Sequence, residues 1–203
     1  MTSFTHIEII GYSAGLISFL NMFRYMYAIQ KTGTKPSLAY WIIAEMAMIL
    51  IALSSYAIGD RTTLWIAVAY ASTQLVIIAL AITKGNYTLR KLDISLIALS
   101  LLSVLIWWYT DNPLYALVIN VGIDASGYIP LFRDIWRDPS REDRIYWGIA
   151  GCACVLNMFA VRDLSFSSVL YPWYLGVVNM IVFVVLIAHT AKPLIRLRNI
   201  FSN

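Results

Sequence analysis

An ionisable residue within an apolar stretch is the strongest candidate for chemistry in this chain. Asp124 lies roughly ten residues into the apolar run Leu114–Phe132. A charge at the middle of a bilayer costs several kcal/mol, so such a residue is a functional candidate by default. Asn120 lies one turn earlier on the same helical face, and Pro130 leaves a backbone carbonyl near Ser126 without its helical hydrogen bond. Asp124 could bind a polyhydroxyl or cationic solute or carry a proton, and the alternative is a buried neutral carboxyl bonded to a neighbouring hydroxyl.

The residue types of most enzyme and metal sites are missing from this sequence. The two histidines, His6 and His189, lie near opposite ends of the chain, at opposite membrane faces. Cys152 and Cys154 are two residues apart and point in different directions on a helix. The sequence has no Ser/His/Asp set, no G-x-S-x-G motif and no glycine-rich phosphate loop. We therefore expect no catalytic residue, no metal site, no cofactor and no enzymatic activity.

The composition indicates which solvent surrounds the segment that carries Asp124. The chain is 60% apolar and 13% charged, with a mean hydropathy of +0.72. Soluble domains are roughly 45–50% apolar and about 25% charged, and a chain of 203 residues has too little core to bury the difference. The composition predicts an integral membrane protein. It excludes a secreted disulfide scaffold, a disordered chain and a nucleic-acid-binding domain.

Apolar runs that are long enough to cross a bilayer recur along the whole chain. A membrane span needs roughly 20 apolar residues to cross about 30 Å of hydrocarbon. Seven runs meet or nearly meet this length, and the connections between them are too short for a soluble domain. We predict a single all-α membrane domain with seven transmembrane helices. They are expected at Ile7–Ala28, Ala39–Ile58, Leu64–Thr83, Ile94–Tyr109, Leu114–Phe132, Ile145–Val161 and Val169–Thr190.

Basic residues are concentrated at alternate connections. Only Arg61 and Arg162 lie on one side of the predicted membrane, and the other thirteen lie on the opposite side. Because cytoplasmic loops carry the excess of Lys and Arg, we predict an outside N-terminus and a cytoplasmic C-terminus. Together with the family resemblance described below, this bias predicts a bacterial inner membrane. Anionic lipid headgroups are a sufficient partner for the basic side, without nucleic acid. The thirteen are Arg24, Lys31, Lys35, Lys84, Arg90, Lys91, Arg133, Arg137, Arg141, Arg144, Lys192, Arg196 and Arg198.

The two halves of the chain share a sequence pattern. A shift of 106 residues aligns Tyr40–Ala47 with Tyr146–Ala153, and both read Y-W-x-I-A-x-x-A. This offset makes residues 7–83 equivalent to residues 114–190, with residues 94–110 as a linker helix. Both halves then have the same orientation, which is a parallel 3+1+3 repeat of a type expected of transporters, with substrate bound near the midplane. The alternative for the Tyr-Trp pairs is an aromatic belt at the cytoplasmic interface.

Short motifs after the first helix of each half carry a resemblance to a known family. The chain resembles the SWEET and PQ-loop superfamily of small seven-helix transporters, which have 3+1+3 topology and an outside N-terminus. The similarity is strongest to uncharacterised bacterial members. The superfamily places a proline in the first helix of each half; Pro130 fits this, whereas Arg24 occupies the equivalent position of the first half. The matching residues are Thr34–Ser37 with Trp41, and Gly127, Pro130, Pro139 and Glu142 with Trp147.

The resemblance implies further residues of a substrate pocket. In this superfamily the third helix of each half contributes an amide to the pocket. By this resemblance Asn179 would line the pocket, together with its repeat partner Thr73 and the adjacent Gln74. The alternative for these side chains is hydrogen bonding between helices.

Two further positions complete the predicted site. Asn157, in the sixth span, would lie lower in the same cavity. Glu45, in the cytoplasmic third of the second span, would pair with Arg24 as an inner gate or extend toward the headgroups. The predicted pocket thus consists of Asp124, Asn120, Asn179, Thr73, Gln74 and Asn157.

Two functions from different classes are compatible with these residues. The first is a small secondary transporter or facilitator of a small polar solute, sugar-like or another metabolite, that works by alternating access around a midplane pocket. The second is a non-transporting accessory subunit of a larger membrane complex, which the mixed charges of Arg133–Arg144 and the departure at Arg24 allow. The first function needs Asp124 and the second does not. A receptor with the same cavity and a homodimeric state are left open by the sequence.

Overall fold

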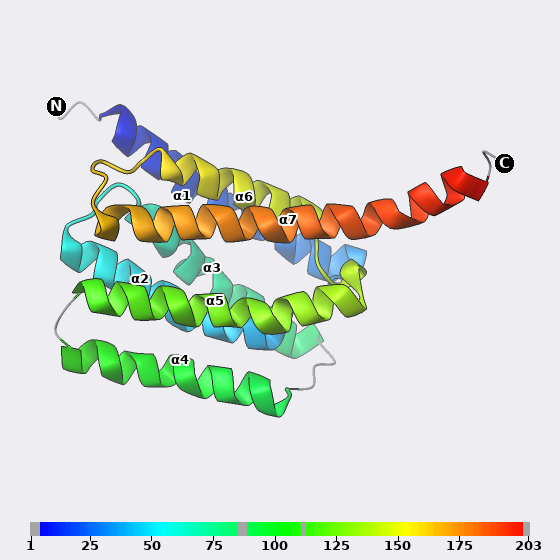
Figure 1. Ribbon diagram of the computed structural model, residues 1–203, viewed down its shortest axis with the longest axis horizontal. Helices are drawn as coiled ribbons and strands as arrows, with labels where there is room; N and C mark the ends of the chain where they lie inside the picture. The colour runs from blue at the N-terminus through cyan, green and yellow to red at the C-terminus, as the bar shows by residue number, and fades with distance from the viewer. Residues whose placement is uncertain (1–4, 85–88, 111–112, 201–203) are drawn as a thin grey trace.

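The chain folds into a bundle of long helices. The computed structural model describes residues 5–84, 89–110 and 113–200, and these ranges contain seven α-helices and no β-strand. Figure 1 shows successive helices running antiparallel along one axis, with the N-terminus and the C-terminus at opposite ends of the bundle. The helices are α1 (His6–Tyr27), α2 (Leu38–Ile58), α3 (Leu64–Lys84), α4 (Lys91–Thr110), α5 (Pro113–Arg137), α6 (Arg144–Met158) and α7 (Phe166–Ile200), with a π turn η1 (Ala28–Thr32) and a 3-10 turn η2 (Pro139–Arg141).

Local sequence signals determine where several helices begin and end. Thr5 and Glu8 form a capping box at the start of α1, in which the Thr5 amide donates to the Glu8 carboxylate at 2.9 Å. Gly33 and Gly59 follow η1 and α2 with φ of 80° and 95°, a left-handed conformation that favours glycine. Asp143 caps α6 by accepting a backbone amide three residues further on at 2.7 Å.

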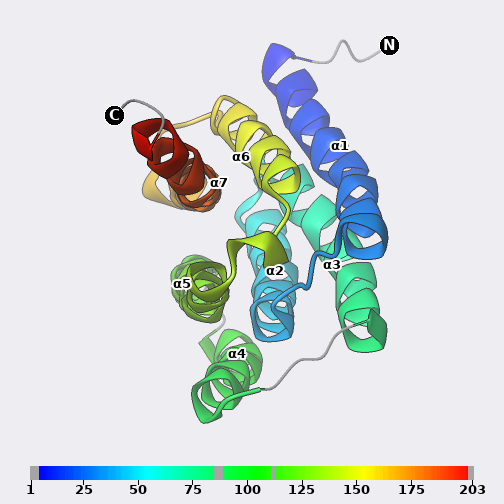
Figure 2. The same cartoon turned by 90° about the vertical axis from the view of Figure 1, so that its right-hand side faces the viewer.

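The helices pack as two groups that face each other. In the first group α3 packs against both α1 and α2, and in the second α7 packs against both α5 and α6. The two groups meet where α1 contacts α6 and where α2 contacts α5. The end-on view in Figure 2 shows α4 at one edge of the bundle, where it packs against α5 and α2. Residues from distant parts of the sequence therefore meet along α1–α6 and α2–α5.

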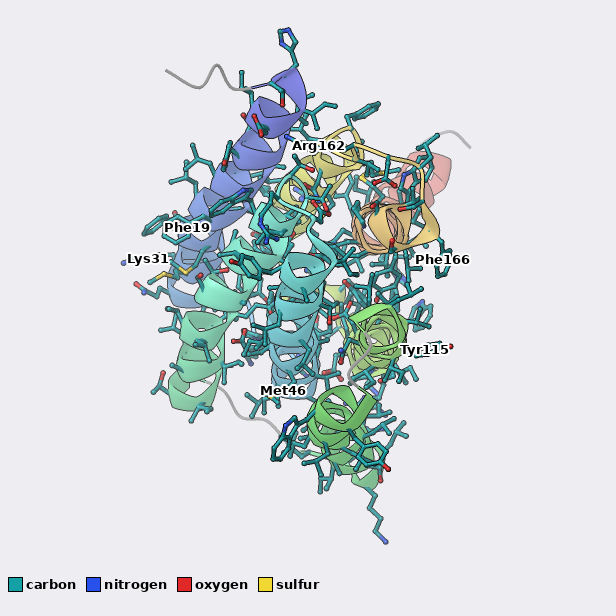
Figure 3. All side chains as sticks on the ribbon, turned by 90° about the vertical axis from the view of Figure 1, so that its left-hand side faces the viewer. Phe19, Lys31, Met46, Tyr115, Arg162 and Phe166 are labelled. Atoms are coloured by element: carbon teal, nitrogen blue, oxygen red, sulfur yellow. The ribbon has the colours of Figure 1, made fainter. Side chains whose placement is uncertain are left out.

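The outer surface of the bundle is apolar. Figure 3 shows the labelled Phe19 and Phe166 pointing away from the helices, and they are 41% and 63% exposed. Exposed leucine, isoleucine and valine side chains accompany them on α1, α2, α3, α4, α5 and α7. Exposed apolar side chains in this number are typical of a surface that contacts lipid or another protein.

Three helices in the described ranges are long and apolar enough to cross a membrane. They are Leu38–Ile58, Leu64–Thr83 and Phe166–His189. The other predicted spans also form helices, but α6 has 15 residues, which is only about 22 Å. The helices α1 and α5 carry buried polar residues such as Asn21 and Asp124 that lower their hydropathy. The structure thus confirms an all-α, membrane-compatible bundle, and the full set of seven spans stays a prediction.

Helix ends differ from the apolar runs that predicted them. The helix α5 continues past Phe132 to Arg137, because Arg133 on this extension bonds Asp93 of α4 at 2.7 and 3.1 Å. The helix α7 likewise continues through the basic tail to Ile200. The charged segment that follows the fifth predicted span is therefore helical as far as Arg137.

Candidate functional site

The Asp124 carboxylate lies in the interior of the bundle, where the residue is 1% exposed. Its Oδ2 atom accepts a hydrogen bond from the hydroxyl of Tyr174 on α7 at 2.7 Å. Its Oδ1 atom is buried and has no hydrogen-bond partner among the described residues. A buried polar atom without a partner costs free energy, so this oxygen is the position where a solute or a proton would add a missing interaction.

Tyrosine hydroxyls gather around this carboxylate. Tyr40 of α2 donates a hydrogen bond to the hydroxyl of Tyr128 of α5 at 3.2 Å. Both phenols interact electrostatically with Asp124, and Tyr171 of α7 does so as well. Sequence reasoning did not identify Tyr174 as the partner of Asp124. The chain has 13 tyrosines, and nothing in their spacing distinguishes this one.

Two side chains expected beside Asp124 are buried, but their donors bond elsewhere. Asn179 is 3% exposed, and its Nδ2 donates to the carbonyl oxygen of Leu175 in the same helix at 2.9 Å. Thr73 is also 3% exposed and donates to the carbonyl oxygen of Ala69 in its own helix at 2.9 Å. In the described part of the chain these donors thus bond their own helices, and no bond from them to Asp124 is formed.

The remaining predicted pocket residues occupy different depths of the bundle. Asn120 is fully buried one turn from Asp124 on α5. Gln74 is 3% exposed, and its Oε1 has no hydrogen-bond partner among the described residues. Asn157 donates to the carbonyl oxygen of Thr63 at 3.3 Å. This bond joins the end of α6 to the start of α3, so Asn157 lies at the N-terminal end of the bundle and not at the depth of Asp124.

The predicted pair of Glu45 and Arg24 is not formed, and this prediction was wrong. Arg24 bonds Asp143 at the start of α6, with Nε donating to Oδ1 at 3.0 Å and a terminal guanidinium nitrogen donating to Oδ2. Both carboxylate oxygens of Glu45 are buried without a hydrogen-bond partner in the described part of the chain. The physical reason is packing: α1 and α2 each lie against α3, whereas α1 contacts α6 directly.

We expect the substitutions Arg24→Gln and Asp143→Asn to be energetically coupled. Asparagine keeps the N-cap function at position 143, so the double-mutant cycle isolates the ion pair. We expect an interaction energy of about 1–2 kcal/mol in the free energy of unfolding, measured by chemical denaturation in detergent. The cycle of Arg24→Gln with Glu45→Gln is the control and should show no coupling. Additive effects of Arg24→Gln and Asp143→Asn would contradict the observed pair.

The two Tyr-Trp pairs of the repeat lie inside the bundle and contact each other. Tyr40, Trp41, Tyr146 and Trp147 are each 1–4% exposed. Trp41 stacks on Trp147 with ring centroids 6.3 Å apart and an interplanar angle of 30°. The alternative of an aromatic belt is therefore wrong for these residues, because belt residues sit among the headgroups. The pairs instead connect α2 to α6, and thus one group of helices to the other.

Glu142 is a polar residue within this aromatic cluster, and sequence analysis places it only in a family motif. It is 6% exposed in the connection between η2 and α6. Its Oε2 atom accepts hydrogen bonds from the Tyr25 hydroxyl at 2.7 Å and the Trp147 indole at 3.0 Å. Burial raises the pKa of Glu142 to about 7, against the lowering effect of the bonds from Trp147, Tyr25 and the Ser37 amide.

We expect Glu142 to make the protein less stable as the pH rises from about 4.5 to about 7. Its pKa is higher in the folded than in the unfolded chain, so the folded state binds more protons in this range and loses stability as they leave. Glu142→Gln should therefore reduce the fall in unfolding temperature across this pH series, measured in detergent. Glu8→Gln is the control, because the pKa of Glu8 is lowered by its hydrogen bond from the Thr5 amide, and its loss should not reduce this fall. Equal slopes for Glu142→Gln and the wild type would refute this assignment.

The described residues contain no group of three His, Cys, Asp or Glu side chains that could hold a metal ion. Comparisons of the chain with protein-family models, with curated proteins and with solved structures found no match. Function is therefore inferred from the surroundings of Asp124 and from the packing of the helices.

Proposed function

We propose that this chain is a small secondary transporter or facilitator of a small polar solute, with Asp124 at the centre of the binding site. The observation that carries this proposal is the carboxylate itself, which is 1% exposed and bonded through one oxygen to Tyr174. A carboxylate in a lipid-surrounded bundle is costly, and such residues mark solute and proton pathways. The unpartnered Oδ1 atom suits a hydroxyl, an amine or a proton.

A parallel 3+1+3 repeat would allow alternating access at this site. In our proposal α1–α3 and α5–α7 are the two halves and α4 is the linker. Exchanging the two halves replaces α1 with α5 and α6 with α2. The contact of α1 with α6 then corresponds to the contact of α5 with α2, as a pseudo-two-fold axis along the membrane normal requires. Asp124 on α5 lies near Tyr40 on α2. A movement between the halves would therefore change its surroundings.

Side-chain contacts on both sides of Asp124 support an occluded state. Toward the C-terminal end of the bundle, Trp41 stacks on Trp147. Toward the N-terminal end, Asn157 bonds the carbonyl oxygen of Thr63. We propose that these contacts open in turn, and that the end with Trp41 faces the cytoplasm, as the distribution of basic residues predicts.

Solute uptake tests this proposal directly. The purified chain is screened for thermal stabilisation by sugars, amino acids and organic amines, because a ligand of the folded state raises its unfolding temperature. Each stabilising solute is then assayed for uptake into sealed liposomes with and without the protein. We expect at least one solute that stabilises the protein and crosses only when the protein is present. A correctly inserted protein without binding or flux across this panel would contradict the proposal.

The native mass of the particle tests the alternative of an accessory subunit. The protein is extracted from its own membrane in mild detergent by a tag on the C-terminus. A particle of one or two copies of the 23.0 kDa chain supports a self-sufficient transporter. A much larger particle with stoichiometric partners would favour the accessory subunit.

A further inference from the structure

A small polar cavity lies at the C-terminal end of the bundle, apart from the Asp124 site. It has a volume of about 70 Å³ and lies where α2 and α4 begin and α5 ends. The charged residues of its wall are four arginines and two aspartates, which leave a net positive charge. They are Arg90, Arg133, Arg137, Arg141, Asp93 and Asp134.

Both aspartates are engaged by a single arginine. Arg133 donates to the two carboxylate oxygens of Asp93 at 2.7 and 3.1 Å, and its Nε donates to Asp134 at 3.2 Å. Asp93 is fully buried and also accepts the backbone amide of Arg90 at 3.0 Å. These bonds hold α4 against α5, and they pair both carboxylates of the cavity with Arg133. The net positive charge of the cavity therefore comes from Arg90, Arg137 and Arg141.

Arg141 has a buried donor that lacks an acceptor. Its Nε atom is buried and has no hydrogen-bond partner among the described residues, although the guanidinium also interacts electrostatically with Asp138. The backbone at this position is held in place, because the amide of Lys35 donates to the Arg141 carbonyl oxygen at 2.8 Å. A buried N–H without an acceptor costs free energy, which an anion in the cavity would recover.

The first turn of α2 borders the same cavity, and the amide of Ser37 before it already bonds Glu142. Leu38 and Ala39 line its wall, and the N-cap residue Ser37 makes no side-chain capping bond. The first amides of a helix have no partner within the helix and lie at the positive end of its dipole. Guanidinium groups and helix N-terminal amides are the donors that proteins use to bind phosphate.

We propose that this cavity binds a phosphate group, carried by an anionic phospholipid or by a soluble phosphate. In this arrangement Arg137 and Arg141 contact the phosphate oxygens, while Arg133 stays bonded to Asp93. The inference does not depend on the proposed transport function, because the cavity shares no residue with the Asp124 site.

Two measurements on the full-length protein test the site. Isothermal titration calorimetry in detergent measures the affinity for inorganic phosphate, with chloride at equal ionic strength as the reference. Thermal unfolding in nanodiscs compares phosphatidylcholine alone with a mixture that contains phosphatidylglycerol. The double variant Arg137→Gln/Arg141→Gln should lower the phosphate affinity about tenfold or more and lose the stabilisation by phosphatidylglycerol. Arg61→Gln/Arg162→Gln removes the same charge at the opposite end, where Arg162 pairs with Glu8. It should keep the wild-type phosphate affinity and the wild-type response to phosphatidylglycerol.

The outcomes distinguish the source of the phosphate. A response to inorganic phosphate alone identifies a soluble ligand, a response to phosphatidylglycerol alone identifies a lipid, and a response to both identifies a site for the phosphate group itself. The proposal is overturned if neither ligand has an effect, or if the double variant responds like the wild type. If the double variant does not fold, the exposed Arg137→Gln replaces it, with an expected loss of about threefold.

Discussion

Asp124→Asn is expected to lower the initial rate of solute uptake by roughly thirtyfold or more while the bundle stays folded. Loss of one partner of a buried, hydrogen-bonded charge interaction costs about 2–5 kcal/mol, and 2 kcal/mol corresponds to about a thirtyfold change. The new amide can still accept the hydrogen bond from Tyr174. Because a buried charge is removed, the unfolding temperature should be unchanged or higher. Uptake into liposomes is measured over a pH series with the solute found by thermal stabilisation.

Matched substitutions separate a specific effect of Asp124 from a general one. Asp163→Asn makes the same chemical change at an exposed position and should leave uptake unchanged. Tyr174→Phe removes only the hydroxyl that bonds Asp124 and should give an intermediate rate. Full uptake by Asp124→Asn with an unchanged pH dependence would exclude Asp124 from the mechanism. That result would favour the accessory-subunit function.

The sequence was sufficient to predict that Asp124 is buried in the bundle, but not that Tyr174 is its hydrogen-bond partner. An aspartate within an apolar run is rare because its burial is costly, and the observed exposure of 1% agrees with that reasoning. A tyrosine leaves no comparable signal, since its ring is compatible with core, interface and binding site alike. Tyr174 becomes recognisable only when the packing of α7 against α5 is known. The sequence also did not predict that the donors of Asn179 and Thr73 bond backbone carbonyls of their own helices.

Helix positions follow from the apolar runs, whereas the pairing of helices does not. The sequence predicts a pair of Arg24 and Glu45, which lie in neighbouring predicted spans. The observed partner of Arg24, Asp143, is 119 residues away in the sequence and is brought close by the packing of α1 on α6. The Tyr-Trp pairs are ambiguous for a related reason, because a buried stack and an interfacial belt have the same residue types. Burial distinguishes them, and a single sequence does not contain that information.

Gly11→Ala is expected to lower the free energy of unfolding by about 3 kcal/mol or more, at the upper limit of ordinary overpacking. A Cβ atom at this position would lie 2.0 Å from the carbonyl oxygen of Thr62 and 2.9 Å from its carbon. Both are backbone atoms and cannot rotate away. The turn is also held in place, because the carboxylate of Asp60 accepts the Thr62 amide at 2.9 Å. To accept the methyl group, α1 must move away from α3.

Two other glycines provide a graded control for this contact. A Cβ at Gly122 on α5 meets nothing within 4 Å, so Gly122→Ala should stabilise the protein by up to about 1 kcal/mol through helix propensity. A Cβ at Gly15 lies 3.0 Å from the carbonyl oxygen of Trp65, and Gly15→Ala should fall between the two. Thermal unfolding in detergent, followed by tryptophan fluorescence, measures the order of stability of the three variants. If Gly11→Ala were as stable as the wild type, α1 would not rest on α3 at the N-terminal end. The closure near Asn157 that supports an occluded state would then lose its structural basis.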